Sequence, residues 1–472
     1  MTTTLSLAAS TPAAVDAGNT AWILASAALV MFMTPGLAFF YGGLVRAKNV
    51  LNMLMMNFIC LALVGILWVL FGFSLSFGQS RADGLIGSSA DFYGLGSPEV
   101  IGSVWGFGPI YQVGQPLPSG AVTAGVPVLV FAMFQLMFAI ITPALISGAV
   151  ADRVRFGGWI AFVMLWATVV YFPVANWVFG TGWILNKLRA EDFAGGTAVH
   201  TNAGAAALAL VLVIGKRVGW RKDPMKPHNV PFVLLGASML WFGWYGFNAG
   251  SEGAADGVAG LAFTTTTLAT CAAVIGWLIV EWLRDGKPTT VGAASGAVAG
   301  LVAITPACAF VSPLGGTAVG LIAGMVCALA ISLKFRFGFD DALDVVGVHL
   351  VGGVTGTLLI GILGFDHGAL AGGVEPKRGL LYGGGLTLLW VQFIAVAAVL
   401  SYSFCMTLLI GSALKRLGFL RVSQETEYTG LDEIEHAETA YNFSTVLGGG
   451  LVGAGASSSS SAPLSTPAGR EV

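Results

Sequence analysis

Long apolar runs separated by short polar stretches dominate the chain from residue 21 to residue 413. A helix needs about 20 apolar residues to cross the hydrocarbon core of a bilayer, and eleven segments meet or nearly meet that length. The pattern therefore predicts eleven membrane-spanning helices, with the two ends of the chain on opposite sides. The predicted spans are residues 21–45, 50–78, 122–150, 157–180, 197–214, 230–250, 258–283, 291–310, 315–333, 344–365 and 384–413.

The residues that flank this region have a different character. Residues 1–20 contain no Lys or Arg, so they lack the charged start of a secretory signal, and we expect the run from Ala21 to be retained as a span. Residues 414–442 are polar and largely acidic, and we expect them to dock onto loops of opposite charge as a regulatory tail. Residues 443–472 are rich in Gly, Ser, Ala and Pro and are predicted to be disordered.

Composition supports an all-α polytopic membrane protein that contacts lipid. Hydrophobic residues make up 56% of the chain and charged residues 10%, against about 25% charged in ordinary globular proteins. A net charge of −2 leaves no global basic surface, which argues against nucleic acid as a partner. The five cysteines lie in apolar stretches without CxxC spacing and are interpreted as small buried hydrophobes.

The Lys and Arg residues fall mostly on one side of the predicted membrane. Seventeen of the 22 follow odd-numbered spans or lie in the C-terminal tail. Because positive loops stay in the cytoplasm, the N-terminus is predicted outside and the C-terminus inside the cell. The five on the opposite side are Arg81, Lys187, Arg189, Lys377 and Arg378.

Two spans share a short motif that suggests an internal repeat. The fifth span contains residues 198–204 (AVHTNAG) and the tenth contains residues 347–353 (GVHLVGG), so in both a small residue and Val precede His, and Gly follows four positions later. Each span is the fifth of a block of five, and an odd block length turns the second block upside down. The sequence thus predicts inverted repeats at about 21–214 and 230–365, followed by a last helix at 384–413.

His200 and His349 therefore lie inside predicted spans at equivalent positions. Ionisable groups are costly there and are usually functional, although a pair of helix-bridging hydrogen bonds is the structural alternative. A metal site is the rival chemical interpretation, but Cys, Asp and Glu are missing at ligand spacing on these faces. Asp192 and Asp344, which precede the two histidines, suit helix-start roles better, so we expect neither metal nor cofactor.

Aromatic and hydroxyl groups gather near the ends of three spans. Residues 244–251 (WYGFNAGS), Phe134 to Phe138 and Trp177 to Phe179 are the relevant stretches. An aromatic belt at the interface is the ordinary explanation. The same groups could instead bind a small cation, because ring faces attract it and a Ser hydroxyl can accept one of its protons.

These motifs resemble the ammonium transporter (Amt/MEP/Rh) family, on the Amt side, from the first span to about Asn442. The resemblance covers several separate stretches in the right order. They are residues 33–44 (MTPGLAFFYGGL), 192–200 (DFAGGTAVH), 243–251 (GWYGFNAGS), 347–349 (GVH) and 430–436 (GLDEIEH).

The resemblance implies a homotrimer of eleven-span subunits that takes up ammonium, with methylammonium as an analogue, each subunit having its own pore. It implies no enzymatic activity. In bacterial relatives a PII-type signalling protein commonly binds the cytoplasmic face. The implied roles are a hydrogen-bond acceptor at Ser251, a cation–π wall and gate at Phe138, a second gate ring at Phe247, a pore-lining pair at His200 and His349, and a buried aspartate at Asp192 that orders backbone carbonyls.

One position departs from the family pattern. Where many members have Trp at the external site, this chain has Phe179, with Trp177 two residues earlier and a one-residue insertion before Asp192. Phe has a weaker cation–π face than Trp, so external affinity is expected to be lower unless a shifted alignment restores Trp177 to that role.

Together these features predict that ammonium binds at the external side and loses its proton near the gate, because dehydration in an apolar pore favours the neutral form. Ammonia is then expected to cross along the two imidazoles. The alternatives are an Rh-like channel for ammonia or carbon dioxide, an ammonium sensor, for which the short tail is unfavourable, and an intramembrane enzyme, which lacks a third catalytic partner within the spans.

Overall fold

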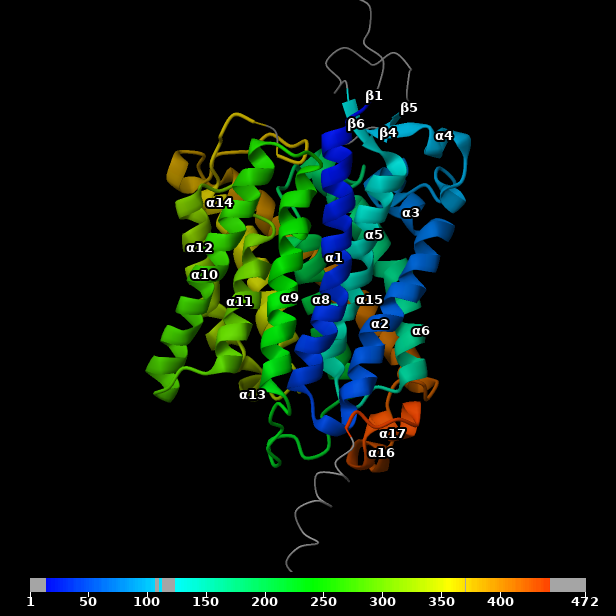
Figure 1. Ribbon diagram of the computed structural model, residues 1–472, viewed down its shortest axis with the longest axis vertical. Helices are drawn as coiled ribbons and strands as arrows, with labels where there is room; N and C mark the ends of the chain where they lie inside the picture. The colour runs from blue at the N-terminus through cyan, green and yellow to red at the C-terminus, as the bar shows by residue number, and fades with distance from the viewer. Residues whose placement is uncertain (1–13, 107–109, 113–123, 370, 442–472) are drawn as a thin grey trace, which may run out of the picture.

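The computed structural model describes residues 14–106, 110–112, 124–369 and 371–441. Helices run nearly parallel through the molecule and form a single bundle (Figure 1). The end that carries β1, β4, β5 and β6 is called the upper end, and the end that carries α16 and α17 the lower end. The predicted disorder of residues 443–472 lies outside the described residues, as do most of residues 1–20.

The prediction of an all-α polytopic protein is confirmed, since ten helical segments of the described chain are long and apolar enough to cross a membrane. The bundle helices are α1 (Ala17–Leu44), α2 (Val50–Leu67), α5 (Val128–Ser147), α6 (Phe156–Trp166), α8 (Asn202–Ile214), α9 (Val230–Ala249), α10 (Gly257–Asp285), α11 (Thr290–Ile304), α12 (Pro313–Ala330), α14 (Val351–Leu363) and α15 (Thr387–Arg416).

Two predicted spans differ from the structure in length. The predicted span 291–310 is α11, which has 15 residues and ends where the chain turns at Thr305. The predicted span 122–150 begins too early, because residues 124–127 form strand β6 and the helix starts only at Val128. Both errors arise because apolar residues extend beyond the helix, after its last residue in α11 and before its first residue in α5.

Several spans contain or begin with a π-helical turn. Such turns join α2 to α3 (Phe73–Phe77) at Trp68–Gly72 and α6 to α7 (Phe172–Val178) at Ala167–Tyr171. Two more, η8 (Gly196–Thr201) and η10 (Val346–Leu350), lead directly into α8 and α14. The last two carry His200 and His349, so the extra residue in the turn alters the direction in which each imidazole points.

Polar residues fix where the helices begin, and glycines let them pack closely. Asp16, for example, caps α1 by accepting the N–H of Asn19, and Asp256 caps α10 by accepting those of Val258 and Ala259. Helices α1 and α9 cross at Gly236, where an added Cβ would overlap the backbone of Phe40. This use of small residues agrees with the high glycine content and is typical of membrane helix contacts.

A small sheet covers part of the upper end (Figure 1). Its strand order is β1-β6-β4-β5, with β1 parallel to β6 and β4 antiparallel to both β6 and β5. Strand β6 runs directly into α5, so the sheet is attached to a bundle helix. The short elements of this end are β1 (Ala14–Val15), β2 (Ser80–Arg81), β3 (Ile86–Gly87), α4 (Pro98–Ile101), β4 (Ser103–Trp105), β5 (Ile110–Gln112) and β6 (Ala124–Pro127).

The lower end holds α13 (Leu333–Phe337), α16 (Gln424–Thr429) and α17 (Leu431–His436). A buried ion network ties the turns of this end together. Arg217 contacts Asp340 at 2.8 Å and Asp152 at 3.4 Å, while Arg153, fully buried, lies 3.6 Å from Asp340. Burial raises the pKa of Asp340, but the Arg217 hydrogen bond and the charges of Arg153 and Arg217 outweigh it and hold that pKa below its ordinary value.

Residues 420–436, here called the docked tail, pack against this network. Arg421 binds the carboxylate of Glu427 at 2.5 Å, and Glu427 also accepts the N–H of Val218 at 2.9 Å. Asp432 accepts the N–H groups of Leu51 and Asn52 at the start of α2. The tail therefore docks onto the loops of this end, and its contacts with the loop at 216–218 are made by the N–H of Val218 and the carbonyl of Lys216, which Arg421 binds.

Candidate functional site

A small cavity of about 70 Å³ lies beneath the upper end of the bundle. Four of the residues predicted for the site line it, and each comes from a different element: Phe138 from α5, Phe179 from the end of α7, Asp192 from the loop before η8, and Ser251 from the turn after α9. The remaining lining residues are Trp105, Phe131, Gln135, Val178, Leu185, Ala190, Phe193, Phe310, Ala371, Gly372 and Val374.

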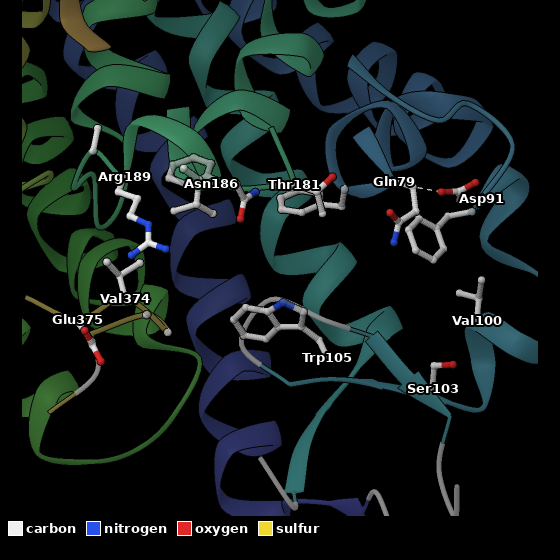
Figure 2. A pocket seen from close by; sticks show the side chains of 18 of the residues that line it. Gln79, Asp91, Val100, Ser103, Trp105, Thr181, Asn186, Arg189, Val374 and Glu375 are labelled. Carbon is white, nitrogen blue, oxygen red and sulfur yellow. Dashed lines mark hydrogen bonds between the residues drawn. The ribbon is translucent and has the colours of Figure 1, made fainter. Parts of the chain in front are cut away.

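The cavity opens toward a wider vestibule of about 940 Å³ at the upper surface. Figure 2 shows its polar rim, with Arg189 and Glu375 on one side and Gln79 and Asp91 on the other, and with the indole of Trp105 reaching across between them. The vestibule and the inner cavity share lining residues, among them Trp105, Phe179 and Gly372, so the two spaces adjoin.

Two phenyl rings in contact separate this cavity from the histidines: Phe138 lines the cavity, and Phe247 lies against Phe138 and His200. The rings of Phe138 and Phe247 have their centroids 4.3 Å apart and are tilted by 38°. Both side chains are at most 1% exposed. The ring of Phe179 lies 6.4 Å from that of Phe138, edge to face, on the cavity side. The two rings are therefore packed against each other at the position expected for the gate.

Ser251 places a hydroxyl at the edge of the cavity. It lies in a 3₁₀ turn (Gly250–Glu252) that continues α9, and its Oγ donates a hydrogen bond of 2.8 Å to the carbonyl of Phe247. The hydroxyl proton is used in that bond, so the oxygen lone pairs remain for a donor in the cavity. The serine can accept a proton donor but is not arranged to donate to an anion.

Asp192 is half-buried, and both of its carboxylate oxygens are occupied by backbone N–H groups. Its two carboxylate oxygens accept the N–H groups of Gly195, Gly196, Thr197 and Ala198 at 2.7 to 3.1 Å. These are the free donors at the start of η8, so the carboxylate acts as a helix cap and orders N–H groups, where carbonyl groups were expected. Burial raises the pKa of Asp192, and the four hydrogen bonds oppose that rise.

His200 and His349 meet below the ring pair. Their Nδ1 atoms are 3.3 Å apart and the rings are stacked at 22°. In such a bond one Nδ1 donates its proton and the other Nδ1 accepts it. The Nε2 atom of His200 has no hydrogen-bond partner in the described part of the chain.

These imidazoles line a separate cavity of about 10 Å³ whose other walls are apolar. That volume is at the lower limit for holding one water-sized molecule. The other lining residues are Met33, Leu37, Ile141, Leu145, Leu240, Trp244, Phe247 and Val298.

The glycine four positions after each histidine explains how the pair comes together. A Cβ on Gly204 would overlap the backbone of Leu350, next to His349. A Cβ on Gly353 would lie 3.0 Å from the Cβ of His200 and closer still to the backbone of Gly196. Each glycine of the repeated motif therefore makes room for the histidine segment of the other.

The structure separates the two candidates for the external aromatic position. Phe179 lines both the cavity and the vestibule. Trp177 points elsewhere: its Nε1 donates a 2.7 Å hydrogen bond to the carbonyl of Leu85, and its ring packs against Trp183 and Tyr402. Of the two, only Phe179 lines these cavities.

The two aspartates predicted near the histidines differ in their contacts. Asp192 caps η8, but Asp344 forms an ion pair with Lys334 at 2.7 Å. The cap of η10 is made by Asp341, whose carboxylate accepts the N–H groups of Val345 and Val346. The sequence analysis named Asp344 and not Asp341, because the two aspartates stand close together before the same helix and the sequence does not show which one caps it.

Two further buried carboxylates hold one segment of the upper surface in place. Glu252 accepts the N–H of Gly372 at 2.7 Å, and Glu191 accepts that of Lys377 at 2.8 Å. Residues 371–377 are thereby fixed over the cavity that Gly372 and Val374 line. Burial raises the pKa of Glu191 to about 7, although the N–H and the charge of Lys377 act against it.

Comparison with known proteins gives a consistent picture. The model of the Ammonium Transporter Family matches residues 21–441. The chain is 54% identical over 442 residues to a protein of Mycobacterium tuberculosis named ammonium transporter, covering 92% of each, and 44% identical to one of Bacillus subtilis, covering 90% of this chain and 98% of that one.

Solved structures agree with the sequence comparisons. The crystal structure of Saccharomyces cerevisiae Mep2 matches with a TM-score of 0.76 at 33% identity, covering 87% of this chain and 91% of that one. A structure titled Sensor Amt Protein matches with a TM-score of 0.76 at 28% identity, covering 89% of this chain and 98% of that one. These similarities are to membrane transport proteins and to a sensor built on the same fold.

Proposed function

The chain belongs to the ammonium transporter family, and from that membership we propose that it carries ammonium across the membrane through a pore within each subunit. The observation that supports this most directly is the order of groups along one path. A cavity with ring faces and a hydroxyl acceptor comes first, then a closed ring pair, then two imidazoles in an apolar space.

The upper end is the external side in this proposal. Seventeen of the 22 Lys and Arg residues belong to the opposite end or to the tail that follows it, which agrees with the retention of positive loops in the cytoplasm. Uptake then begins at the vestibule, where Figure 2 shows acidic and amide side chains together with Arg189 at the rim.

Selection rests on hydrogen bonding and ring faces, because ammonium and potassium have similar sizes. The hydroxyl oxygen of Ser251 accepts one N–H of the ion, and the rings of Phe138 and Phe179 provide cation–π faces. Asp192 makes the surroundings favourable for a cation without touching it, since its oxygens already accept four N–H groups. One hydroxyl cannot replace the hydration shell of potassium as a cage of carbonyls would.

Below the ring pair the path becomes apolar and has room for one small molecule. A charged ion is strongly disfavoured there, so the ion releases its proton on the cavity side and ammonia enters. The shared proton of His200 and His349 leaves one imidazole nitrogen that can donate and one that can accept, and both suit ammonia. Neutral imidazoles bind it too weakly to trap it.

Uptake of methylammonium into liposomes, with current recorded at the same time, tests this function. Wild-type protein should accumulate the analogue and exclude potassium. His200→Ala or His349→Ala should abolish uptake or change its selectivity while the protein still assembles. Wild-type uptake and selectivity in both variants would contradict the role of the pair. The current decides whether the proton returns to the vestibule or crosses as well.

Assembly and regulation form the second part of the proposal. We infer a homotrimer, as the family resemblance implies, which native mass spectrometry tests. The docked tail supports regulation by a PII-type protein, because its Glu427 binds the N–H of Val218, next to the Arg217 that pairs with Asp340 at this surface. Deletion from Val422 onward should reduce activity in a trimer that still forms. Full activity with an unchanged response to nitrogen status would leave the tail without this role.

A further inference from the structure

We propose that Trp105 is a substrate-binding residue of the upper site, supplying from a strand outside the bundle the indole face that Phe179 lacks. This inference rests on the proposed function, that is, on ammonium being bound in the upper cavity. It goes further by assigning the strongest aromatic contact to the small sheet and away from the helix that carries Phe179.

The position of the indole is the first argument. Trp105 lines the cavity of about 70 Å³ and a neighbouring cavity of about 10 Å³. Both cavities are also lined by Gln135 and Ser251, so Trp105 and the hydroxyl acceptor lie at the same place. Figure 2 shows the indole extending across the pocket, with Val374 on one side and Ser103 on the other.

The second argument is that the ring is held firmly. Its centroid lies 4.1 Å from that of Phe131 and the two planes differ by 9°. Phe131 itself packs against Phe77 at 5.0 Å, so the indole belongs to a fixed aromatic stack. A side chain held in one orientation loses little conformational entropy when it binds an ion.

The backbone of Trp105 is fixed as well. Strand β4 lies between β5 and β6, with Trp105 opposite Ile110 and Val126, and β6 continues into α5, which carries Phe131 and Phe138. An added Cβ on Gly125 would overlap the carbonyl oxygen of Trp105, so the glycine permits this close approach. The strand is therefore joined through β6 to the helix that carries Phe138.

The chemistry gives the third argument. Trp has the strongest cation–π face of the aromatic residues, and contacts of this kind contribute about 0.5–2 kcal/mol. At about 1.4 kcal/mol per tenfold change in affinity, this corresponds to about a two- to thirtyfold effect. Trp105 and Phe179 both line the 70 Å³ cavity, so an ion there lies beside one ring from the sheet and one from the bundle.

The test measures methylammonium uptake into liposomes as a function of concentration. Trp105→Leu should raise KM by about two- to thirtyfold and leave the maximal rate unchanged, because the pore below is untouched. Trp105→Phe keeps a ring against Phe131 and should raise KM by less. Adding Phe179→Trp to the Trp105→Leu protein should restore part of the affinity.

Trp183 offers a matched control, since it lies at the same end, packs against Trp177, and lines neither small cavity. Trp183→Leu should leave KM at the wild-type value. A KM unchanged in Trp105→Leu, or a loss confined to the maximal rate, would show that Trp105 only supports the sheet and would overturn the inference. Wild-type protein that takes up no methylammonium would instead overturn the transport function itself.

Discussion

The cap on the first histidine segment gives the sharpest stability prediction. Replacing Asp192 by Asn keeps the side-chain size but leaves a single carbonyl oxygen in place of two acceptors. The amide NH₂ then faces two of the four N–H groups that the carboxylate binds, either those of Gly195 and Gly196 or those of Thr197 and Ala198. Each buried N–H left without an acceptor costs about 1–3 kcal/mol, so the expected loss is about 2–6 kcal/mol.

Thermal unfolding of the detergent-solubilised protein, followed by tryptophan fluorescence, measures this loss. Glu191→Gln is the matched control, because this neighbouring carboxylate accepts the single N–H of Lys377 and Gln can accept it equally well. Asp192→Asn should unfold at a clearly lower temperature, and Glu191→Gln should not. Equal unfolding temperatures for Asp192→Asn and wild type would refute the capping argument.

Three other predictions follow from the geometry of the same molecule. Ser251→Ala should weaken apparent methylammonium affinity by about 1–3 kcal/mol, the cost of an unmet hydrogen bond to a charged group, as read from the KM of uptake. The pKa of Glu191 is raised to about 7 from an ordinary 4.5, so folding favours the neutral carboxyl and its contribution to stability falls as the pH rises between these values. The decline amounts to about 3 kcal/mol at 1.36 kcal/mol per pKa unit. Unfolding curves at pH 5 and pH 8 should show this decline in the wild type and not in Glu191→Gln. The lowered pKa of Asp340 acts in the opposite sense, because the stabilisation by this carboxylate is present above pH 3.8 and is lost as the pH falls through the lowered pKa. Asp340→Asn should therefore unfold at a lower temperature than wild type at pH 7. The difference between the two unfolding temperatures should become smaller in stronger acid.

Much of the fold could be predicted because length and apolar character decide which segments span a bilayer. The predicted bounds were wrong where apolar residues lie outside the helix. Residues 305–310 are as apolar as α11 before them, but they turn, with the N–H of Phe193 bound to the carbonyl of Pro306. Residues 124–127 pair with β4 and β1, a contact between distant parts of the chain that no local pattern reveals.

The site was partly predictable for a similar reason. A histidine inside an apolar span is rare enough to stand out, so His200 and His349 could be identified singly, and their shared motif paired them. Trp105 could not be found this way, because it lies in a short strand outside the predicted spans, where an aromatic residue does not stand out. The sequence could not show which of Asp341 and Asp344 caps the helix, because both stand shortly before it. In the structure Asp344 has a positive φ of 62° and its side chain pairs with Lys334, which leaves the cap to Asp341.

The docked tail also links the order of synthesis to the finished structure. Asp432 is among the last described residues that a ribosome would add, yet it binds the N–H groups of Leu51 and Asn52, where α2 begins. All of the bundle helices are already made when this contact forms. A chain truncated after residue 420 would contain every bundle helix but would leave the N–H groups of Leu51 and Asn52 without the Asp432 carboxylate. This contact therefore forms only in a chain that has been translated past residue 432.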